Sequence, residues 1–584
     1  SFQHPTILTK EVFMNDIRRT ILWVIFGFSM VLLWDKWQLH NGNKATFFPT
    51  TPAVTAPAAN APASGAAGAA SVPSASSASV PAPAAVAAAA GASAVPGQAA
   101  PAVKRERVEV KTDLYRLTFD TEGGSLVQAE LLQHIDMADK ARNFLLLDES
   151  AQRVYVAQTG LVGGTFPTHK TAMTVVPGPR ELKDGEDSIS IRFESPEQGG
   201  VKLAKTWTIK RGAYDIAVKH EVVNTGSTAV SPQLYLQLVR DGNKPPGESS
   251  FYSTFTGPAV YTDAKKYQKI EFKDIESGKI DIPKDSANGY AAMVQHYFAT
   301  AWLLADGVQR EPFVRKVDTN LYSVGMLTSL GTIEPGATKT IDARLFAGPQ
   351  VETMMEKLYP GLELVKDYGW LTILSKPLYW LLDNLHKLLG NWGWSIVALV
   401  LLLKIAFYWL NAKAYASMAK MKAINPRIME MRERLKDKPQ QMQQEMMRIY
   451  REEKVNPMGG CFPIMIQIPV FIALYWVLLS SVEMRNAPWI GWIHDLSTPD
   501  PYFILPLLMT ASSLLQTALN PAPPDPMQAK MMWFMPLIFS VMFFFFPAGL
   551  VLYWLTNNIL SIAQQWIINT RMGVPPQFNL PKFK

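Results

Sequence analysis

The spacing of hydrophobic residues changes near position 350, which separates two long segments of different character. Between residues 104 and 350, short runs such as 108–111 and 188–193 alternate apolar with polar residues. A period of two residues is typical of strands that bury one face, and steps such as Gly123-Gly124 supply turns between them. Many short strands without a long helical pattern predict a large antiparallel β-sandwich domain over 104–350.

Beyond residue 350 the hydrophobic residues recur at helical spacing. Residues 368–389 place leucines on one face but carry several charged side chains, so this stretch predicts an amphipathic helix at a membrane interface, inside a connector over 351–391. Five strongly apolar runs follow, most of them close to the length of about 20 residues that crosses a bilayer. We expect these transmembrane helices at 392–410, 462–482, 502–519, 532–546 and 549–568, as a core over 392–568.

A further apolar run near the N-terminus is predicted to be a membrane anchor. It covers 20–37, follows an arginine pair and ends in a Trp-Asp-Lys-Trp sequence that suits a membrane interface. A cleaved signal peptide is the alternative, but no small-x-small cleavage site follows, and the flanking residues match a twin-arginine signal poorly. We therefore expect an uncleaved signal anchor with residues 1–19 in the cytoplasm. Met14 is a plausible start, which would make residues 1–13 an upstream extension.

Composition and charge set the remaining boundaries. Residues 38–103 are almost entirely Ala, Pro, Ser, Val and Gly, without large side chains to offset the entropy of ordering, so we expect a disordered linker. Residues 412–457 carry eleven Lys/Arg against six Asp/Glu, whereas 483–501 carry one Arg and three acidic residues. The positive-inside rule places the first loop in the cytoplasm and the second outside it. Six crossings then place both termini, including the basic tail 569–584, in the cytoplasm and the sandwich outside.

Candidate groups for catalysis are scarce. A single cysteine, Cys461, excludes an internal disulfide framework and a multi-cysteine metal site. The chain has no phosphate-binding Gly-rich loop, no His-Glu-x-x-His and no Gly-x-Ser-x-Gly. The net charge of +7 gathers beside apolar runs, which indicates membrane topology rather than DNA binding. His134, His220 and His296 are available as acid–base groups, but isolated histidines in strands are more often structural. We therefore expect no enzyme, no cofactor and no metal site.

Lys404 is the most informative residue of the apolar core. It lies two-thirds of the way along the run at 392–410, where a central lysine costs about 2.5–3.5 kcal/mol and normally faces a cavity or a partner. No acidic residue lies inside any predicted core span to neutralise it. Snorkelling of the ammonium to the membrane surface is the alternative, because Lys413 lies only nine residues further on. We favour a water-filled cavity that opens toward the cytoplasm.

Milder polar residues in the other spans are predicted to line the same groove. Those of the last span recur at helical spacing, and Tyr408 follows Lys404 by four residues. Interhelical hydrogen bonding alone could explain any one of them, but their convergence favours a groove. The predicted groove residues are Lys404, Tyr408, Gln467, Ser512, Gln516, Tyr553, Asn557 and Ser561.

The cytoplasmic segment 412–456 is predicted to form a helical hairpin. It is rich in Met, Lys, Arg, Gln and Glu, which favour helix, and Asn425-Pro426 and Lys438-Pro439 interrupt it, so the hairpin should turn near 436–439. Its methionines would give an adaptable surface for varied partners, with ordinary helix–helix packing as the alternative. The residues expected to receive a client protein are Met418, Met421, Arg432, Arg434, Met446 and Met447.

Several long motifs resemble the YidC family of membrane protein insertases. In the core they include 456–469 (NPMGGCFPIMIQIP), 492–496 (WIHDL) and 546–553 (FPAGLVLY). In the predicted sandwich, 110–113 (VKTD) and 295–302 (QHYFATAW) are similar to the periplasmic domain of the Gram-negative members. The resemblance covers the chain except for the Ala/Pro linker and the extreme termini.

The resemblance implies an insertase of the bacterial inner membrane that works alone or with the Sec translocon, without covalent catalysis or nucleotide hydrolysis. It implies nascent membrane proteins, the ribosome, Sec translocon components and phospholipid as partners. It also implies a periplasmic β-supersandwich and a hydrophilic groove that opens to the cytoplasm and the lipid but is closed toward the periplasm.

Three positions depart from the family pattern. Lys404 stands for the arginine of the family's groove, which keeps the positive charge but loses the bidentate fork. Tyr553-Trp554 stand for its tandem tyrosines, so Trp554 joins the predicted groove residues. Trp409 replaces a proline that bends the family's helix, and without the proline there is no reason to expect that bend.

Two other classes of function remain open from the residues alone. A polytopic transporter should carry a paired ion-binding site near the midplane, often between repeated halves, but the chain has one unpaired lysine and no repeat. A membrane-anchored carbohydrate-active enzyme would use the sandwich. Deletion of most of residues 105–348 would abolish such an activity, whereas an insertase would still insert a small client.

Overall fold

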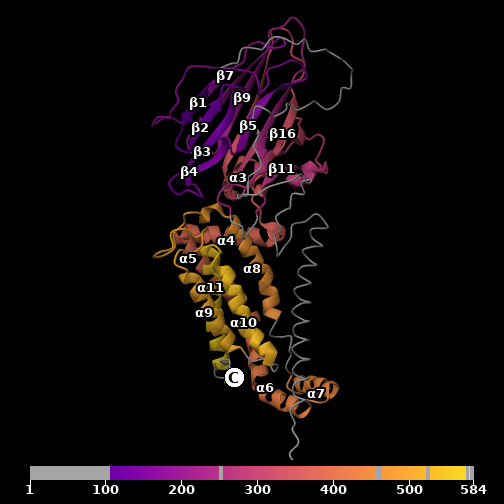
Figure 1. The fold of residues 1–584 in the computed structure, drawn as a ribbon, viewed down its shortest axis with the longest axis vertical. Coiled ribbons are helices and arrows are strands. Elements are labelled where there is room, and N and C mark those ends of the chain that lie inside the picture. The colour runs from indigo at the N-terminus through magenta and orange to yellow at the C-terminus, as the bar shows by residue number, and fades with distance from the viewer. Residues whose placement is uncertain (1–104, 249–253, 455–461, 521–525, 574–577, 579–584) are drawn as a thin grey trace, which may run out of the picture.

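The structure is a computed structural model, and it describes residues 105–248, 254–454, 462–520, 526–573 and 578. The predicted anchor, the Ala/Pro linker, Cys461 and most of the basic tail lie outside the described residues. The described chain forms a β-sandwich and a bundle of helices that lie end to end along the long axis of the molecule (Figure 1). The change from strands to helices falls near residue 350, where the hydrophobic spacing predicts it.

Two antiparallel sheets build the sandwich, which confirms the predicted fold class of this domain. One sheet has eight strands in the order β1-β2-β3-β4-β5-β10-β16-β15, and the other has nine in the order β12-β11-β13-β14-β17-β9-β8-β7-β6. One short helix, α2 (Phe272–Glu276), lies between β12 and β13 in sequence. The strands are β1 Arg107–Lys111, β2 Tyr115–Asp120, β3 Ser125–Ile135, β4 Asn143–Glu149, β5 Val154–Val162, β6 Thr174–Val175, β7 Ser188–Glu194, β8 Val201–Lys210, β9 Asp215–Asn224, β10 Gln233–Asp241, β11 Gly257–Thr262, β12 Lys266–Lys269, β13 Tyr290–Val294, β14 Phe298–Leu304, β15 Glu311–Asp318, β16 Leu321–Ser329 and β17 Thr338–Pro349.

Side-chain burial follows the hydrophobic pattern strand by strand. In β9 every second residue is buried, because one face of the strand covers the core and the other is more open. Side chains of both sheets meet inside, where the ring of Phe119 in β2 lies 5.3 Å from that of Trp207 in β8. Trp207 and Trp302 of β14, both from the nine-stranded sheet, are fully buried with ring centroids 6.1 Å apart. Burial of such rings stabilises the sandwich by about 25 cal/mol per Å² of apolar surface.

The three candidate histidines of the sandwich lie in structural positions. His220 is fully buried in β9 with Nε2 3.0 Å from the Thr159 hydroxyl, and burial lowers its pKa to about 3. His296 is buried with Nε2 2.9 Å from the carbonyl oxygen of Leu479, and burial lowers its pKa to about 4. Burial also lowers the pKa of His134 to about 4. All three are therefore neutral near pH 7, which suits packing residues better than acid–base catalysts.

A lysine is enclosed between the sheets. Lys205 of β8 is fully buried, and its ammonium donates to the carbonyl oxygens of Gly123 at 2.5 Å and Thr159 at 2.6 Å. Burial lowers the pKa of Lys205 to about 7. Gly123 has a φ of +72°, and a Cβ there would lie 2.3 Å from the carbonyl oxygen of His169. The predicted Gly-Gly turn therefore needs glycine for space as well as for backbone conformation.

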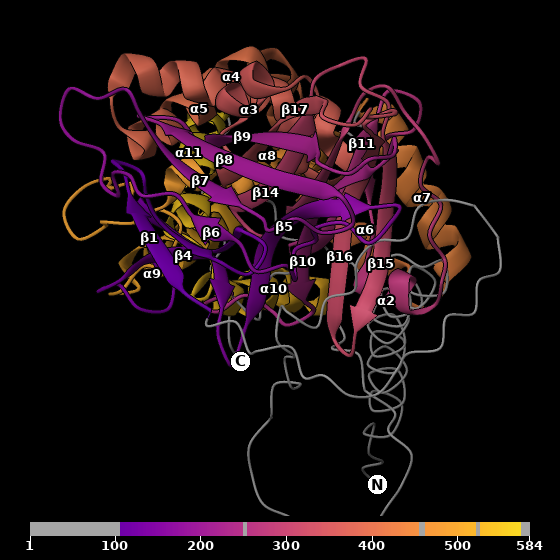
Figure 2. The same cartoon turned by 90° about the horizontal axis from the view of Figure 1, so that it is seen from above.

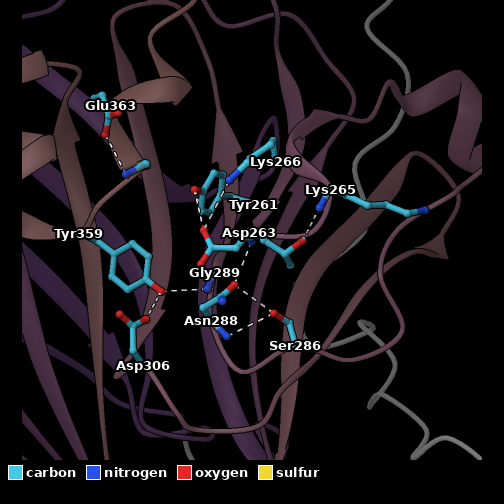
Figure 3. Close-up of polar contacts among 12 residues, drawn as sticks. Tyr261, Asp263, Lys265, Lys266, Ser286, Asn288, Gly289, Asp306, Tyr359 and Glu363 are labelled. Atoms are coloured by element: carbon cyan, nitrogen blue, oxygen red, sulfur yellow. Dashed lines mark hydrogen bonds and ion pairs between the residues drawn. The ribbon is translucent and has the colours of Figure 1, made fainter.

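Polar contacts anchor the connector to the loops that adjoin β13 and β14 of the nine-stranded sheet (Figure 3). The Tyr359 hydroxyl donates to Asp306 Oδ1 at 2.7 Å and accepts from the backbone N–H of Gly289 at 2.8 Å. Gly361 has a φ of +90° and packs against the ring of Tyr261. A Cβ on residue 361 would lie only 2.7 Å from that ring. The chain thus leaves the sandwich from a fixed point before the long helices begin.

Helices and the loops between them make up the rest of the described chain, and each predicted apolar run of the core overlaps a helix. Both views show α4 crosswise to the long helices (Figures 1 and 2), and Figure 1 shows it between them and the sandwich. It contains most of the predicted amphipathic segment. The helices, with 3-10 turns labelled η, are α3 Glu352–Leu358, η2 Leu362–Val365, η3 Gly369–Leu371, α4 Thr372–Leu389, α5 Trp392–Ala406, α6 Tyr408–Arg434, α7 Pro439–Glu452, α8 Phe462–Ser480, η4 Val482–Met484, α9 Ile504–Leu519, α10 Pro526–Phe543 and α11 Ala548–Arg571.

The chain bends sharply between α5 and α6. Taken singly, no helix of the described residues has the length and hydropathy of a full membrane span; α5 and α6 reach them together but meet at 69°. The sequence offers no reason to expect this bend, because Trp409 replaces the family's proline, so the structure corrects that expectation. In a continuous helix the Lys404 carbonyl would accept from residue 408, whereas here it accepts from Gln564 Nε2 of α11 at 3.2 Å. A side chain of another helix therefore supports a bend without proline.

The loop after α8 joins the bundle to the sandwich. The carbonyl oxygen of Leu479 in α8 accepts the hydrogen bond from His296 that was described above. Val482 belongs to the buried core of the sandwich. The guanidinium of Arg485 donates to the carbonyl oxygen of Ile135 at 2.6 Å, at the end of β3. The two parts of the molecule therefore share hydrogen bonds and apolar core, in addition to the connector.

Candidate functional site

A cavity opens among α5, α6, α8 and α11. Its empty space is about 450 Å³, including the part that is open to the surroundings. Most of the wall surface is apolar, although five of the ten lining residues carry a polar group: an ammonium, three amides and a phenol. The lining residues are Val400, Leu403, Lys404, Phe407, Leu410, Asn411, Gln467, Val470, Tyr553 and Asn557.

Lys404 lies in the last turn of α5 and is only 6% exposed. Its ammonium donates to the Ser561 hydroxyl of α11 at 2.6 Å. Within the described ranges, no carboxylate lies within ion-pair distance of this ammonium. The side chain therefore points into the bundle, as a cavity requires, rather than toward a membrane surface.

The predicted polar stripe of α11 faces the cavity and its neighbours. Tyr553 and Asn557 line the cavity, Ser561 holds Lys404, and Gln564 binds the backbone at the bend. From the facing helix α8, Gln467 Nε2 donates to Asn557 Oδ1 at 2.7 Å. Because residues three or four apart share one face of a helix, this stripe could be read from the sequence.

Aromatic rings form the neighbourhood of Tyr553. The Tyr553 side chain is 3% exposed and its ring stacks on Phe471 of α8, with centroids 5.8 Å apart. Trp554 packs edge-on against Phe471 at 4.4 Å and lies 5.1 Å from Phe543 of α10. Trp554 is not part of the cavity wall and instead joins α11 to α8 and α10.

The structure does not bring three other predicted groove residues to the cavity. Tyr408 is 40% exposed, because the bend ends α5 before it and turns its side chain away, so that Phe407 lines the cavity instead. Ser512 and Gln516 belong to α9. Ser512 is buried and accepts a hydrogen bond from Asn558 Nδ2 at 3.1 Å, on a different face of α11 from the cavity stripe.

This second polar face of α11 was missed from the sequence. Asn558 donates to Ser513 at 2.8 Å as well as to Ser512, and Gln565 donates to Asn520 Oδ1 at 3.2 Å. These bonds join α9 to α11 along two helical turns, as polar residues do in helix pairs within a membrane. Asn558 and Gln565 are seven residues apart, a spacing that would have predicted a second stripe.

The predicted hairpin is present as α6 and α7, with its turn between Arg434 and Pro439. Asn425-Pro426 does not interrupt it, because α6 runs through Pro426 without a break. The proline is exposed, so water can satisfy the backbone carbonyl that loses its partner there. Buried side chains of both helices hold the hairpin together: Ile424, Ile428, Met431 and Ile449.

The candidate client-receiving residues of the hairpin fall into two groups. Met421 and Met446 pack against the buried cluster between the helices, as the helix-packing alternative expects. Met447 is 46% exposed and Arg434 is exposed, so these two face outward. Met418 and Arg432 are half-buried. Some methionines of the hairpin therefore pack between its helices, and others lie on its surface.

The cavity offers hydrogen bonds and one positive charge rather than groups for covalent chemistry. Its polar side chains are a lysine, amides and a tyrosine, without a carboxylate or imidazole among the lining residues. In the part of the chain that the structure describes, no three His, Cys, Asp or Glu side chains are grouped so as to hold a metal ion. Such a site can bind and orient a polar segment of another molecule.

Comparison with known proteins covers nearly the whole chain. The YidC periplasmic domain family matches residues 107–381, and the 60Kd inner membrane protein family matches residues 384–574. A membrane protein insertase YidC from Ralstonia nicotianae is 56% identical over 566 residues, which covers 96% of this chain and 98% of that protein. The insertase YidC of a Janthinobacterium species is 52% identical over 574 residues, 96% of this chain and all of that protein.

A solved structure is also similar over much of the chain. An active YidC insertase crystal structure, in which the first transmembrane domain is resolved, is 20% identical to this chain. The match covers 78% of this chain and 91% of that one, with a TM-score of 0.37.

Proposed function

Because this chain belongs to the YidC family of membrane protein insertases, we propose that the cavity beside Lys404 is the groove through which it inserts client proteins. Insertion of proteins into the membrane is the activity of the family. The observation that carries the proposal is the buried ammonium of Lys404, which faces a cavity and holds a single serine hydroxyl. A lysine at such a position normally marks a pathway or a partner's binding site.

The membrane arrangement follows from the same proposal. Five core crossings and the N-terminal anchor place both termini in the cytoplasm and the sandwich in the periplasm of a bacterial cell. The excess of basic residues in 412–457 over 483–501 supports this orientation. The protein works alone or with Sec translocon components, on nascent chains that a ribosome delivers.

The hairpin of α6 and α7 acts first, as the surface that meets a nascent segment. Met429 and Met447 are about half exposed on it, and methionine adapts to varied apolar partners. Arg432 and Arg434 lie near the turn of the hairpin, and they add positive charge. The basic tail touches ribosomal RNA or anionic lipid.

Lys404 acts next, on the short tail of the client that must cross to the periplasm. An acidic residue of that tail can replace the Ser561 hydroxyl at the ammonium, because a hydrogen bond between two charged groups is stronger than one to a neutral hydroxyl. Gln467 and Asn557 offer further polar partners in the cavity wall. These groups lower the cost of bringing a polar tail part of the way across the bilayer.

The apolar segment of the client then leaves sideways into lipid. Tyr553 and Trp554 with Phe543 form an aromatic side of the route, and α10 exposes a row of large apolar side chains beyond it. Burial of the segment at about 25 cal/mol per Å² drives this step. Neither covalent catalysis nor nucleotide hydrolysis is needed.

The test compares Lys404→Met with Lys413→Met, an exposed lysine outside the cavity wall. Insertion of small single-span clients is measured in proteoliposomes, with translocated tails that differ only in two acidic residues. Lys404→Met should lower insertion of the acidic tail on the order of tenfold, the effect of about 1.4 kcal/mol, and spare the neutral tail.

The control Lys413→Met should insert both clients as the unchanged protein does. Equal losses for acidic and neutral tails in Lys404→Met would contradict charge attraction. Photo-crosslinking from position 553 to a ribosome-bound nascent chain adds a second readout, and the absence of adducts would rule out this cavity as the route.

A further inference from the structure

The ends of the two helices that carry Lys404 and Ser561 are tied to one loop. This capping loop, residues 485–503, follows η4 and precedes α9. Inside it, the Leu496 N–H donates to the Ala487 carbonyl at 3.0 Å and the Trp489 N–H donates to the Ile493 carbonyl at 3.0 Å. These bonds fold the loop back on itself, so that it forms one compact unit between α5 and α11.

Asn391 ties α5 to the capping loop with both ends of its side chain. Its Oδ1 accepts from the Trp394 N–H at 3.0 Å, which makes Asn391 the N-cap of α5. Its Nδ2 donates to the carbonyl oxygens of Pro488 and Trp489, both at 3.2 Å. Gly393 supports the contact, because a Cβ there would lie 2.2 Å from the Trp489 ring. One amide therefore starts the helix and also holds it to the loop.

The same loop holds the first turn of α11. The Ala548 N–H donates to the Thr498 carbonyl at 2.8 Å, and the Gly549 N–H donates to the Leu496 carbonyl at 2.9 Å. The loop thus supplies acceptors for N–H groups that have no partner within the helix. Because α5 and α11 both begin at the capping loop, they run in the same direction away from it.

Lys404 and Ser561 lie at nearly the same distance from this common origin. Lys404 follows Trp392, the first residue of α5, by twelve positions, and Ser561 follows Ala548, the first residue of α11, by thirteen. At a rise of 1.5 Å per residue, the two distances are about 18 and 20 Å. A slip of one residue between the helices would shift one side chain by about 1.5 Å and break the 2.6 Å hydrogen bond.

We propose that Asn391 is a positioning residue for insertion: it fixes α5 to the capping loop and thereby sets Lys404 level with the polar stripe of α11. The inference rests on the proposed role of Lys404 in the groove. It adds that the alignment of the groove is determined at the opposite end of the bundle, about 20 Å away, by an amide that does not touch the cavity.

Asn391→Asp isolates the contact to the loop. A carboxylate keeps the Oδ1 acceptor for the N-cap, and its charge suits a helix N-terminus, but it cannot donate to the two loop carbonyls. Asn391→Ser is the second variant, since serine also caps a helix but is too short to reach both carbonyls. The two variants keep the start of α5 and remove its attachment.

Spin labels report the register of the helices without a client. Leu402 of α5 and Ile567 of α11 are 41% and 49% exposed and do not line the cavity, and they lie at different depths, so axial slip changes the distance between them. The labels are placed in full-length protein with Cys461→Ser, in nanodiscs. Both Asn391 variants should shift or broaden the distance distribution by about 1.5 Å or more. Unchanged distributions in both variants would overturn the proposal.

Client insertion separates positioning from general stability. Asn391→Asp should lower insertion of an acidic-tailed client by about tenfold, which one or two hydrogen bonds can account for. In a Lys404→Met background it should cause little further loss, because it acts through Lys404. Equal losses in both backgrounds would overturn the positioning role. If Lys404→Met alone has no effect, the charge-attraction proposal fails, and the spin-label distances still decide whether Asn391 sets the register.

Discussion

Lys205 and Lys404 are two of the buried lysines among the described residues, and the difference between them separates a structural group from a functional one. The ammonium of Lys205 donates to two backbone carbonyls inside a closed core, so two of its three hydrogens have fixed partners. Lys404 donates to one serine hydroxyl and borders a cavity. Only the second lysine has room at its ammonium for a group from another molecule.

Lys205 makes the stability of the sandwich depend on pH. Its pKa is about 7 in the folded protein and near the ordinary value of 10.5 in the unfolded chain. Between these values the unfolded chain holds the proton and the folded protein does not, so stability should rise with pH across that window and be insensitive to this residue below it. Lys205→Met should flatten the rise.

The measurement for Lys205 is urea unfolding of the full-length protein in detergent at pH 7 to 10, followed by circular dichroism near the β-sheet minimum. Lys202→Met, at an exposed position three residues earlier in β8, is the matched control. A slope that stays the same in Lys205→Met would show that this amine does not control it. His220 contributes a separate rise between about pH 3 and 6.5, because its folded pKa is lowered to about 3.

For single residues, the sequence predicted which side chains belong to the site better than it predicted what they contact. Lys404 stands out because charge is costly in an apolar run, so its inward position could be expected. Its partner Ser561 lies 157 residues away, and only the packing of α5 on α11 shows that the two meet. Tyr408 was misplaced because a straight helix was assumed where the chain bends, and the group that supports the bend, Gln564, is on another helix.

At the scale of elements, α11 carries two different polar faces. One faces the cavity with Tyr553, Asn557 and Ser561, and the other binds α9 through Asn558 and Gln565. Helical spacing shows both faces in the sequence, but it does not say which neighbour each face meets. Strands such as β5 and β14 are buried at every position, so the alternation of polar and apolar residues, which marks β9, is absent from them.

The hairpin of α6 and α7 depends on a small core of its own. Ile428 is 1% exposed between the two helices, so Ile428→Ala should destabilise the hairpin by about 2–5 kcal/mol. Met429, the next residue, is 55% exposed, and Met429→Ala should change little. Limited trypsin digestion after Lys436 in the turn, and after the lysines and arginines of the two helices, measures the opening. Equal cleavage rates in both variants would show that the cluster does not hold the helices together.

At the scale of the whole molecule, the sandwich and the bundle meet through a charged and aromatic joint. Arg485 lies over the ring of Phe298 at 5.1 Å and donates to the Ile135 carbonyl. Beside it, Glu483 accepts from the Tyr379 hydroxyl of α4 at 2.6 Å and pairs with Lys366 at 3.4 Å. The loop that ends α8 is therefore held from both sides, by the sandwich and by the connector.

Loss of Arg485 should loosen this joint without unfolding either part. Arg485→Ala removes a guanidinium that is partly buried among rings, and hydrogen–deuterium exchange should quicken in η4 and at the end of β3. Arg142→Ala, whose side chain is 81% exposed, is the control. Mass spectrometry of peptides from the full-length protein gives the exchange rates. Unchanged exchange at both segments would show that Arg485 does not hold the sandwich to the bundle.

The overall plan of the molecule could be predicted, but its assembly could not. The boundary near residue 350, the sandwich class and the order of the core helices follow from the spacing of hydrophobic residues. The strand order, in which β17 pairs with β9 and β10 pairs with β16, joins segments about 100 residues apart and has no signature in local pattern. The joint at Arg485 is likewise invisible, because a lone arginine in a loop reads as a solvated charge.

The sandwich is attached to the helices at two separate places, at Tyr359 in the connector and at Arg485 in the capping loop. With a single attachment, the sandwich could rotate about that point relative to the helices. Two attachments remove that rotation. A force applied to the sandwich would therefore turn or tilt the whole bundle with it.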